Sequence, residues 1–170
     1  KRQFKDNASK VDALEYLVQS YETLAFSQTN WVSNLSNAAS LIWHCYKSMG
    51  VDINWSGFYL KDKDQTLYLG PFMGKVACQT IKIGKGVCGT CADKLETQLV
   101  PNVELYPGHI ACDGETKSEI VVPIVQNGSI LAVIDIDCVV LNGFDEIDVK
   151  YLELLATKIS ETCVFSPIAL

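Results

Sequence analysis

The sequence predicts an α+β domain in which helices from both ends of the chain pack on a central antiparallel sheet. Three observations favour this fold class: helical periodicity near each end, strand-like runs between the ends, and an Asn-Gly hairpin signal. No internal repeat or Pro/Ser-rich linker divides the 170 residues, of which 48% are hydrophobic. We therefore expect one domain over residues 1–170.

Two helices are expected in the first part of the chain. Apolar side chains recur at helical spacing over residues 11–25, and Ser9 with Asp12 three residues later fits a capping box. A second run of the same period covers residues 32–49. Gly50 follows it, and glycine readily takes the left-handed conformation found at helix C-termini.

The middle of the chain changes to strand patterns. Antiparallel strands, paired in sequence order, are expected over residues 55–60, 66–71 and 78–83. The clearest hairpin joins residues 119–126 to residues 129–140 through Asn127-Gly128, which favours a type I′ turn. A last helix begins at Asp145 and continues to Cys163.

The charge balance excludes two classes of partner. With 14 Lys+Arg against 20 Asp+Glu the net charge is -6, so the chain lacks the broad basic surface that nucleic acid or an anionic membrane attracts. Its apolar runs are too short to span a bilayer, and its polar start precedes no signal-type core. We expect a cytoplasmic protein that binds neither nucleic acid nor membrane.

The seven cysteines are too few for a disulfide scaffold in a chain of this length, and their number is odd, which favours a reducing compartment. Cys45, Cys138 and Cys163 lie in apolar surroundings and are expected to be small buried hydrophobes. The other four fall in one central stretch, where three interpretations compete: Cys78, Cys88, Cys91 and Cys112.

The first interpretation is a dinucleotide-binding loop. Residues 84–89 read Gly-Lys-Gly-Val-Cys-Gly, between a strand and a short helix expected over residues 88–95. A Rossmann unit requires a parallel neighbouring strand, whereas these strands are expected to be antiparallel. A tight glycine turn at the mouth of a pocket is therefore favoured.

The second interpretation is structural zinc. Cys88-x-x-Cys91 and His109-x-x-Cys112 have the pair spacing of a zinc ribbon. Neither pair sits in a short hairpin knuckle, and a domain this apolar does not need a metal to fold. We expect no metal, with structural zinc as the alternative.

The third interpretation is redox chemistry, in which a thiolate becomes a sulfenic acid that a second cysteine converts to a disulfide. Cys112 suits the first role because it lies in the irregular segment 102–118, whose length is typical of a functional lid. His109 as a cation would lower the pKa of Cys112, although an exposed loop histidine without a role is the alternative. Cys78 and Cys88 are candidates to resolve the sulfenic acid.

Seven motifs follow one another along the chain: Asn-Trp-Ser-Gly-Phe-Tyr at residues 54–59, Pro-Gly-His-Ile-Ala-Cys-Asp at 107–113, and others at 74–78, 84–90, 118–123, 134–137 and 144–145. Together they resemble the free methionine-(R)-sulfoxide reductases, which are single GAF domains. The likeness covers roughly residues 30–161. It implies a GAF-like core preceded by an N-terminal helix.

This resemblance implies reduction of free methionine-R-sulfoxide to methionine, with no cofactor and with thioredoxin as the reductant. Cys112 is then the expected nucleophile, and Cys78 and Cys88 are the expected recycling cysteines. Cys91 departs from the family pattern, which leaves the resolving partner open. A homodimer is also implied, with the N-terminal helix as a candidate interface.

Three carboxyl groups resemble those of the family's pocket: Glu119, Asp135 and Asp137. Asp135 and Asp137 alternate on one strand and project from one face, where crowding raises one pKa enough to keep a proton for the sulfoxide oxygen. These carboxylates also suit the ammonium group of an amino acid, and Gly-rich backbone amides suit its carboxylate. Trp55 and Tyr59, on one strand face, would cage the substrate methyl group, with core packing as the alternative.

The competing function is a non-catalytic GAF module that binds a small ligand and signals, because one fold serves many functions. The central cysteines together with the three acids favour the enzyme.

Overall fold

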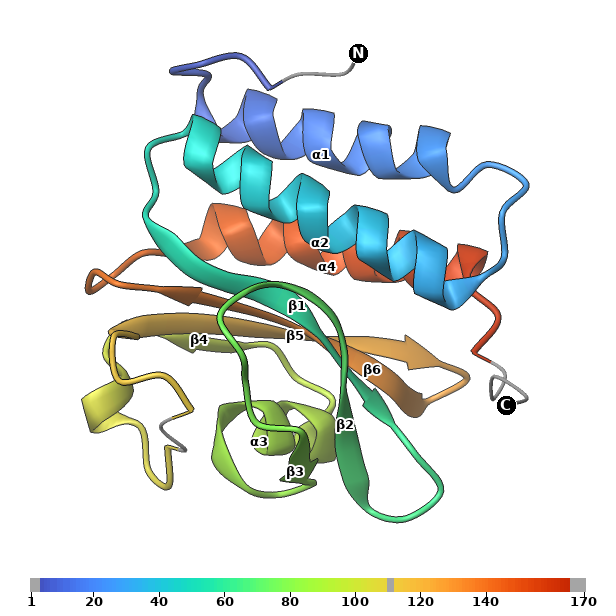
Figure 1. The fold of residues 1–170 in the computed structure, drawn as a ribbon, viewed down its shortest axis with the longest axis vertical. Coiled ribbons are helices and arrows are strands. Elements are labelled where there is room, and N and C mark those ends of the chain that lie inside the picture. Colours follow the sequence, from blue (N-terminus) through green and yellow to red (C-terminus); the bar gives the residue numbers. More distant parts are fainter. Residues whose placement is uncertain (1–3, 110–111, 166–170) are drawn as a thin grey trace.

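A six-stranded antiparallel sheet divides the molecule into two sides in the computed structural model, which describes residues 4–109 and 112–165 (Figure 1). The strands lie in the order β3-β2-β1-β6-β5-β4. Their bounds are β1 (Ile53–Lys61), β2 (Thr66–Gly74), β3 (Thr80–Lys82), β4 (Gln98–Val100), β5 (Ser118–Gln126) and β6 (Ser129–Cys138). The predicted α+β class with a central antiparallel sheet is confirmed.

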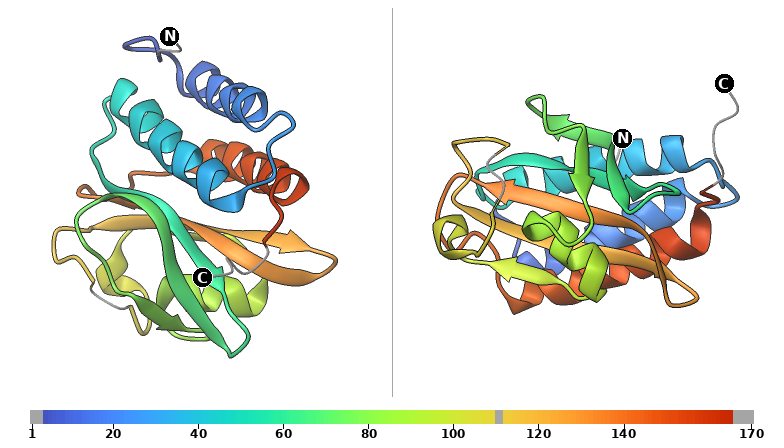
Figure 2. Two further views of the ribbon diagram at one scale, coloured as in Figure 1. Left: turned by 45° about the vertical axis from the view of Figure 1, so that its right-hand side comes forward. Right: turned by 90° about the horizontal axis from the view of Figure 1, so that it is seen from below.

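Helices cover both sides of this sheet (Figure 2). Helices α2 (Trp31–Ser48) and α4 (Glu146–Thr162) pack directly on one side, and α3 (Gly86–Lys94) lies on the other. Helix α1 (Lys10–Leu24) forms an outer layer over α2 and α4. The predicted packing of N- and C-terminal helices on the sheet is confirmed by α2 and α4, and α1 packs with its apolar face on these two helices.

The helix ends follow the sequence signals. Ser9 Oγ accepts a hydrogen bond from the backbone N–H of Asp12 at 3.2 Å, and Gly50 is left-handed with φ 74°. At the start of α4, Asp145 accepts the N–H of Asp148, whose carboxylate accepts the N–H of Asp145 in return. This full capping box fixes where α4 begins.

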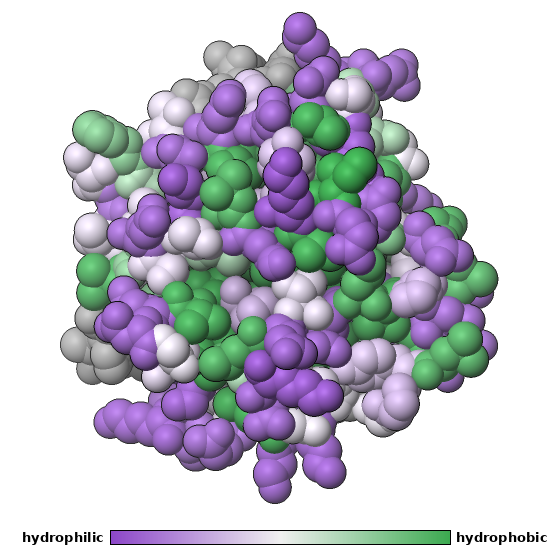
Figure 3. All heavy atoms as spheres, turned by 180° about the vertical axis from the view of Figure 1, so that it is seen from behind, coloured by the Kyte–Doolittle hydropathy of each residue, from purple (hydrophilic) through white to green (hydrophobic). Residues whose placement is uncertain are grey.

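Two buried clusters form the core, one on each side of the sheet. The helix side is the larger and contains Cys45, Cys138 and Cys163, as predicted. The α3 side contains Trp55, Tyr59 and two cysteines of α3. Seen from behind, polar side chains cover much of the surface with apolar ones among them (Figure 3). Within the described part of the chain, no helix is long and apolar enough to cross a membrane.

The hairpin of β5 and β6 turns at Asn127 and Gly128, whose φ angles are 52° and 76°, as the type I′ prediction requires. Two other expectations fail at short edge strands. Strand β3 begins at Thr80, so Cys78 precedes it instead of lying in it, and β4 was not predicted. Strands of three residues show too little alternation to be recognised in sequence.

Candidate functional site

A cavity of about 50 Å³ lies on the α3 side of the sheet. Its walls come from β1, β5 and β6, from the first turn of α3, and from two irregular segments that carry Cys78 and Cys112. Sequence positions far apart therefore meet at one pocket. This free space is large enough for a few water molecules.

Cys78 and Cys112 form a disulfide at this pocket, with their Cα atoms 5.7 Å apart. Cys112 follows residues 110–111, which are outside the described part, and Cys78 lies between β2 and β3. Of the cysteines predicted to do redox chemistry, these two are joined. Cys88 and Cys91 are free and buried in α3.

The three predicted acids meet on the pocket side of the sheet. Glu119 of β5 and Asp137 of β6 are cross-strand partners, and Asp135 lies two residues before Asp137. Glu119 and Asp135 are each 6% exposed. Among the described residues, neither Asp135 Oδ1 nor Asp137 Oδ1 has a hydrogen-bond partner. A shared proton, a water molecule or a donor group of a ligand would satisfy these oxygens.

Burial and mutual repulsion keep protons in this cluster. Burial, followed by the charge of Asp137, raises the pKa of Glu119 well above its usual range. Burial, then the charge of Glu119, raises the pKa of Asp135. Burial, then the charge of Asp135, raises the pKa of Asp137. Carboxyl groups with pKa values raised in this way retain a proton more readily than exposed ones, which is what proton donation requires.

The cysteines of α3 have an environment that opposes the thiolate. Burial, then the charges of Asp135 and Glu119, raises the pKa of the Cys88 thiol. Burial also raises the pKa of Cys91, whose Sγ donates to the carbonyl of Val121 at 3.6 Å. Both thiols stay protonated and poorly nucleophilic.

Trp55 and Tyr59 line the pocket together, and their rings stack with centroids 5.8 Å apart. Trp55 also stacks on Phe72, with centroids 5.2 Å apart. The two rings are almost fully buried, so they are at once part of the core and a wall of the pocket. Core packing and a place in the pocket wall are therefore not alternatives for these two side chains.

His109 lies beside the acids. Its Nε2 is 3.6 Å from Glu119 Oε1, and its side chain is 16% exposed. Burial lowers its pKa, which opposes the cationic form expected to activate Cys112. The alternative of an exposed loop histidine is also wrong, because His109 forms part of the pocket wall.

The glycine motif before α3 is a tight turn. Gly84 and Gly86 have φ angles of 93° and 66°, and the Gly84 N–H donates to the carbonyl of Gly89 at 2.9 Å. Lys85 caps α3 without a side-chain hydrogen bond, so the first N–H groups of α3 stay available at the pocket. The dinucleotide interpretation fails because β3 and β4, which flank α3, lie at opposite edges of an antiparallel sheet.

The zinc-ribbon interpretation also fails. Cys112 is bonded to Cys78, and Cys91 points to the carbonyl of Val121. Within residues 4–109 and 112–165, the side chains placed to hold a metal are instead Cys88, Glu119 and Asp135, whose ligand atoms lie within 4.8 Å of one another. These belong to the acid cluster of the pocket.

One residue near the pocket was missed as a functional candidate. Asn54, directly before Trp55, donates hydrogen bonds from Nδ2 to Asp113 Oδ2 and Thr116 Oγ1, both at 3.0 Å. Asn54 is visible in the sequence as the first residue of the Asn-Trp-Ser-Gly-Phe-Tyr motif. Its role is not, because its two partners lie 59 and 62 positions further along the chain.

The sequence and the fold are similar to those of known proteins. The model of the GAF domain family matches residues 37–162. The free methionine-R-sulfoxide reductase of Saccharomyces cerevisiae is 61% identical over 95% of this chain and 92% of the relative. The reductase of Escherichia coli is 38% identical over 90% of each chain.

A solved structure is similar over nearly the same length. The free methionine-R-sulfoxide reductase of Neisseria meningitidis, in complex with its substrate, superposes with a TM-score of 0.87 at 35% identity, over 95% of this chain and 94% of that one. Fold, family model and relatives thus agree. The chain belongs to the GAF domain family and, within it, to the free methionine-R-sulfoxide reductases.

Proposed function

We propose that this chain reduces free methionine-(R)-sulfoxide to methionine, using Cys112 as nucleophile, Cys78 as resolving cysteine and thioredoxin as reductant. The observation that carries the proposal is the Cys78–Cys112 disulfide at a pocket that also holds three buried carboxyl groups. The named activities of the yeast and bacterial relatives support the substrate.

The reaction transfers one oxygen atom. The Cys112 thiolate attacks the sulfoxide sulfur, the oxygen passes to Cys112 as a sulfenic acid, and methionine leaves. The Cys78 thiol then attacks the sulfenic sulfur, which forms the disulfide and releases water. A thioredoxin dithiol reduces this disulfide and becomes oxidised itself.

The acids supply what a sulfoxide lacks as an electrophile. A protonated carboxyl of Glu119 or Asp137 donates a hydrogen bond to the sulfoxide oxygen, which the raised pKa values make available at neutral pH. Asp135, together with whichever of Glu119 and Asp137 is ionised, pairs with the substrate ammonium. That cation would provide the partner that the two unpaired aspartate oxygens need.

The rest of the pocket fits the remaining substrate groups. The free N–H groups at the start of α3 suit the substrate carboxylate, because a helix N-terminus favours an anion. The stacked rings of Trp55 and Tyr59 offer an apolar wall to the methyl group.

Cys78 is preferred over Cys88 as the resolving cysteine. Cys78 already bonds Cys112, whereas burial beside Asp135 raises the pKa of Cys88 and keeps it as a thiol. Cys88 then acts in recycling only after the Cys78–Cys112 disulfide has opened.

The alternative function, a ligand-sensing module, would bind methionine sulfoxide without consuming it.

Thioredoxin recycling suits a reducing compartment, so a cytoplasmic location is part of the proposal. The inner face of α1 packs on α2 and α4, and a homodimer through α1 would therefore use its outer face. Light scattering on the purified protein tests that assembly.

One assay tests the proposed reaction. The protein is incubated with racemic free methionine sulfoxide and dithiothreitol, and the remaining epimers are separated on a chiral column. We expect loss of the R epimer alone, and little turnover of the N-acetylated substrate, which lacks the ammonium. Equal rates on free and N-acetylated substrate would contradict the proposed pocket, and binding without turnover would favour the sensor.

A further inference from the structure

Asn54 occupies a bulge between β1 and β6. Ile53 pairs with Cys138 and Trp55 pairs with Asp137, so three residues of β1 oppose two neighbours on β6. Ile53 belongs to the helix-side core and Trp55 to the α3-side core. Regular alternation would put residues 53 and 55 on one face, so the bulge turns the strand toward the pocket at residue 54.

The bulged residue fastens the segment that carries Cys112. Asn54 Nδ2 donates to Asp113 Oδ2 and to Thr116 Oγ1, each at 3.0 Å. The other oxygen of Asp113 accepts the backbone N–H of Glu115 at 2.9 Å. Because Asp113 directly follows Cys112, these bonds hold the backbone next to the reactive sulfur.

The following residues of the same strand fasten the other cysteine. Trp55 Nε1 donates to the carbonyl of Lys75 at 3.1 Å, and the Tyr59 hydroxyl donates to the carbonyl of Cys78 at 2.8 Å. Neither Cys78 nor Cys112 lies in a helix or strand. Strand β1 is therefore the rigid element from which both irregular, cysteine-bearing segments are held.

We propose that Asn54 is a positioning residue of the redox cycle, and that its hydrogen bonds to Asp113 and Thr116 hold Cys112 within reach of Cys78. In the step concerned, the Cys78 thiol attacks the Cys112 sulfenic acid, the S–S bond forms, the S–O bond breaks and water leaves. Asn54 touches neither sulfur. Its effect on this step rests on the proposed function, but its effect on the dithiol–disulfide equilibrium does not.

The size of the effect follows from chain entropy. The segment between β4 and β5 is long, and without its anchor the reduced Cys112 samples more positions, so the effective concentration of one sulfur at the other falls. Loss of two hydrogen bonds, one to a carboxylate, justifies an expected decrease of about tenfold.

The experiment equilibrates the whole protein with reduced and oxidised glutathione and measures the fraction of Cys78–Cys112 disulfide, with no sulfoxide present. For Asn54→Asp we expect the equilibrium constant for disulfide formation to fall at least about tenfold, because a carboxylate then faces Asp113. In the double variant Asn54→Asp/Asp113→Asn the constant should return to within about threefold of wild type. There the amide introduced at position 113 donates to position 54, and its oxygen still accepts the Glu115 N–H.

The rescue separates positioning from general destabilisation, since two destabilising changes would add. Asn102→Asp is the matched control: the Asn102 side chain accepts the N–H of Glu104, which aspartate does as well, so the equilibrium should not change. A wild-type constant in folded Asn54→Asp, or no recovery in the double variant, overturns the proposal.

A second pair covers the case in which Asn54→Asp does not fold. Thr116→Val removes the hydroxyl that Asn54 contacts, whereas Thr116→Ser keeps it, so only the valine variant should shift the equilibrium, by about threefold to fivefold. Equal constants in the two variants overturn the proposal. If the protein shows no sulfoxide reduction at all, the glutathione equilibrium still decides the role of Asn54.

Discussion

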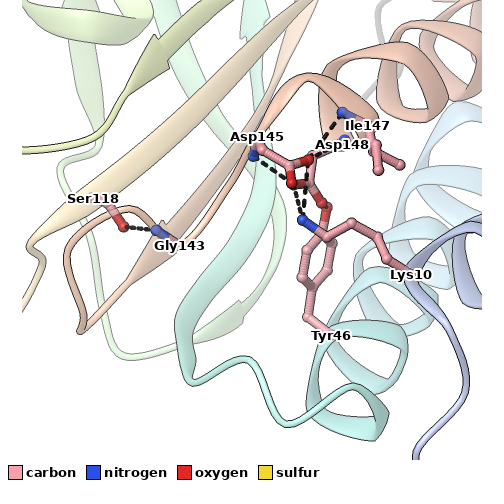
Figure 4. Close-up of polar contacts among 7 residues, drawn as sticks. All are labelled: Lys10, Tyr46, Ser118, Gly143, Asp145, Ile147 and Asp148. Carbon is pink, nitrogen blue, oxygen red and sulfur yellow. Dashed lines mark hydrogen bonds and ion pairs between the residues drawn. The ribbon is translucent and has the colours of Figure 1, made fainter.

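The buried acids on the two sides of the sheet differ in their hydrogen-bond and ion-pair partners. On the helix side, Asp148 is fully buried and accepts hydrogen bonds from the Tyr46 hydroxyl at 2.7 Å, Lys10 Nζ at 2.6 Å and the Asp145 N–H at 2.7 Å (Figure 4). On the pocket side, Glu119 and Asp135 are buried beside another carboxyl group. Asp148 has partners from α1, from α2 and from the N-cap of α4, whereas no Lys or Arg pairs with the pocket acids in residues 4–109 and 112–165.

The difference indicates what each acid is for. A buried carboxylate with a cation and matched donors holds structure together, here α1, α2 and α4. Buried acids that raise one another's pKa at a cavity are costly for folding and typical of functional sites. The sheet keeps the two apart, since neighbouring residues of β5 point to opposite sides. Ser118 accepts the Gly143 N–H near the start of α4 (Figure 4). The next residue, Glu119, lines the pocket on the other side.

The largest expected effect concerns the pocket-side cysteines. Cys112→Ser should yield no methionine even in a single turnover, because a hydroxyl is too weakly acidic to supply the attacking anion. Cys78→Ser/Cys88→Ser should release about one methionine per subunit and then stop, with a sulfenic acid on Cys112 that a dimedone-type reagent traps. Single-turnover assays with mass spectrometry measure both.

Cys91 is tested alongside. If it replaces the missing resolving cysteines, the double variant cycles with thioredoxin and the triple variant with Cys91→Ser does not. Cys91 is buried on the α3 side of the sheet, where it contacts the Val121 carbonyl. We therefore expect that Cys91 does not replace the missing cysteines. A full first turnover by Cys112→Ser, with the sulfenic acid on Cys88, would reverse the assignment of the nucleophile.

The next prediction separates function from stability on the pocket side. Glu119→Gln should lower turnover about 10²- to 10⁴-fold, the usual contribution of a general acid, without lowering the free energy of unfolding at neutral pH. The control is Glu104→Gln, an exposed acid of the neighbouring segment. Steady-state kinetics and urea denaturation on the same samples measure the two effects. A stable variant with wild-type turnover would make Glu119 a bystander.

The helix side should respond in the reverse manner. Asp148→Asn removes the buried charge that pairs with Lys10, which keeps its ion pair with Asp145, and should lower the free energy of unfolding by about 1 to 3 kcal/mol. Turnover per folded molecule should stay within about twofold, because Asp148 lies across the sheet from the pocket. Glu146→Gln, exposed on the same helix, serves as control. Loss of activity without loss of stability would remove the distinction between the two sides.

The smallest expected effect is an opposite dependence of stability on pH. The folded-state pKa of Glu119 is raised, so its contribution is complete below about pH 4 and is lost as the pH rises toward the folded pKa. For Asp145, burial alone would raise the pKa, but hydrogen bonds from Lys10 and backbone N–H groups lower it. The contribution of Asp145 to stability is therefore present above about pH 4 and is lost as the pH falls through its folded-state pKa.

Urea midpoints of wild type, Glu119→Gln and Asp145→Asn between about pH 2 and 8 measure these trends. Relative to Glu119→Gln, the wild type should lose stability as the pH rises above about 4. Relative to Asp145→Asn, it should lose stability as the pH falls below about 4. Parallel curves for all three proteins would contradict the pKa directions on both sides.

The sequence by itself determined the elements whose cause is local. Helical periodicity, the Asp145 cap and the Asn127-Gly128 turn act within a few residues, and the structure places α4 and the β5–β6 hairpin where they predict. Strand alternation likewise put Asp135 and Asp137 on one face, and their crowding was foreseen. These features need no knowledge of distant contacts.

Only the tertiary structure decided which distant groups meet. Strand β1 pairs with β6, and Cys78 is joined to Cys112 across 34 residues. Burial lowers the pKa of His109. All three features depend on contacts that sequence spacing does not encode. The bulge at Asn54 is the clearest case, because the strand predicted from sequence begins only at residue 55 and no local signal marks a bulge before it. Local propensity is set by neighbouring residues, whereas register, burial and pKa are set by the packing of segments far apart in the chain.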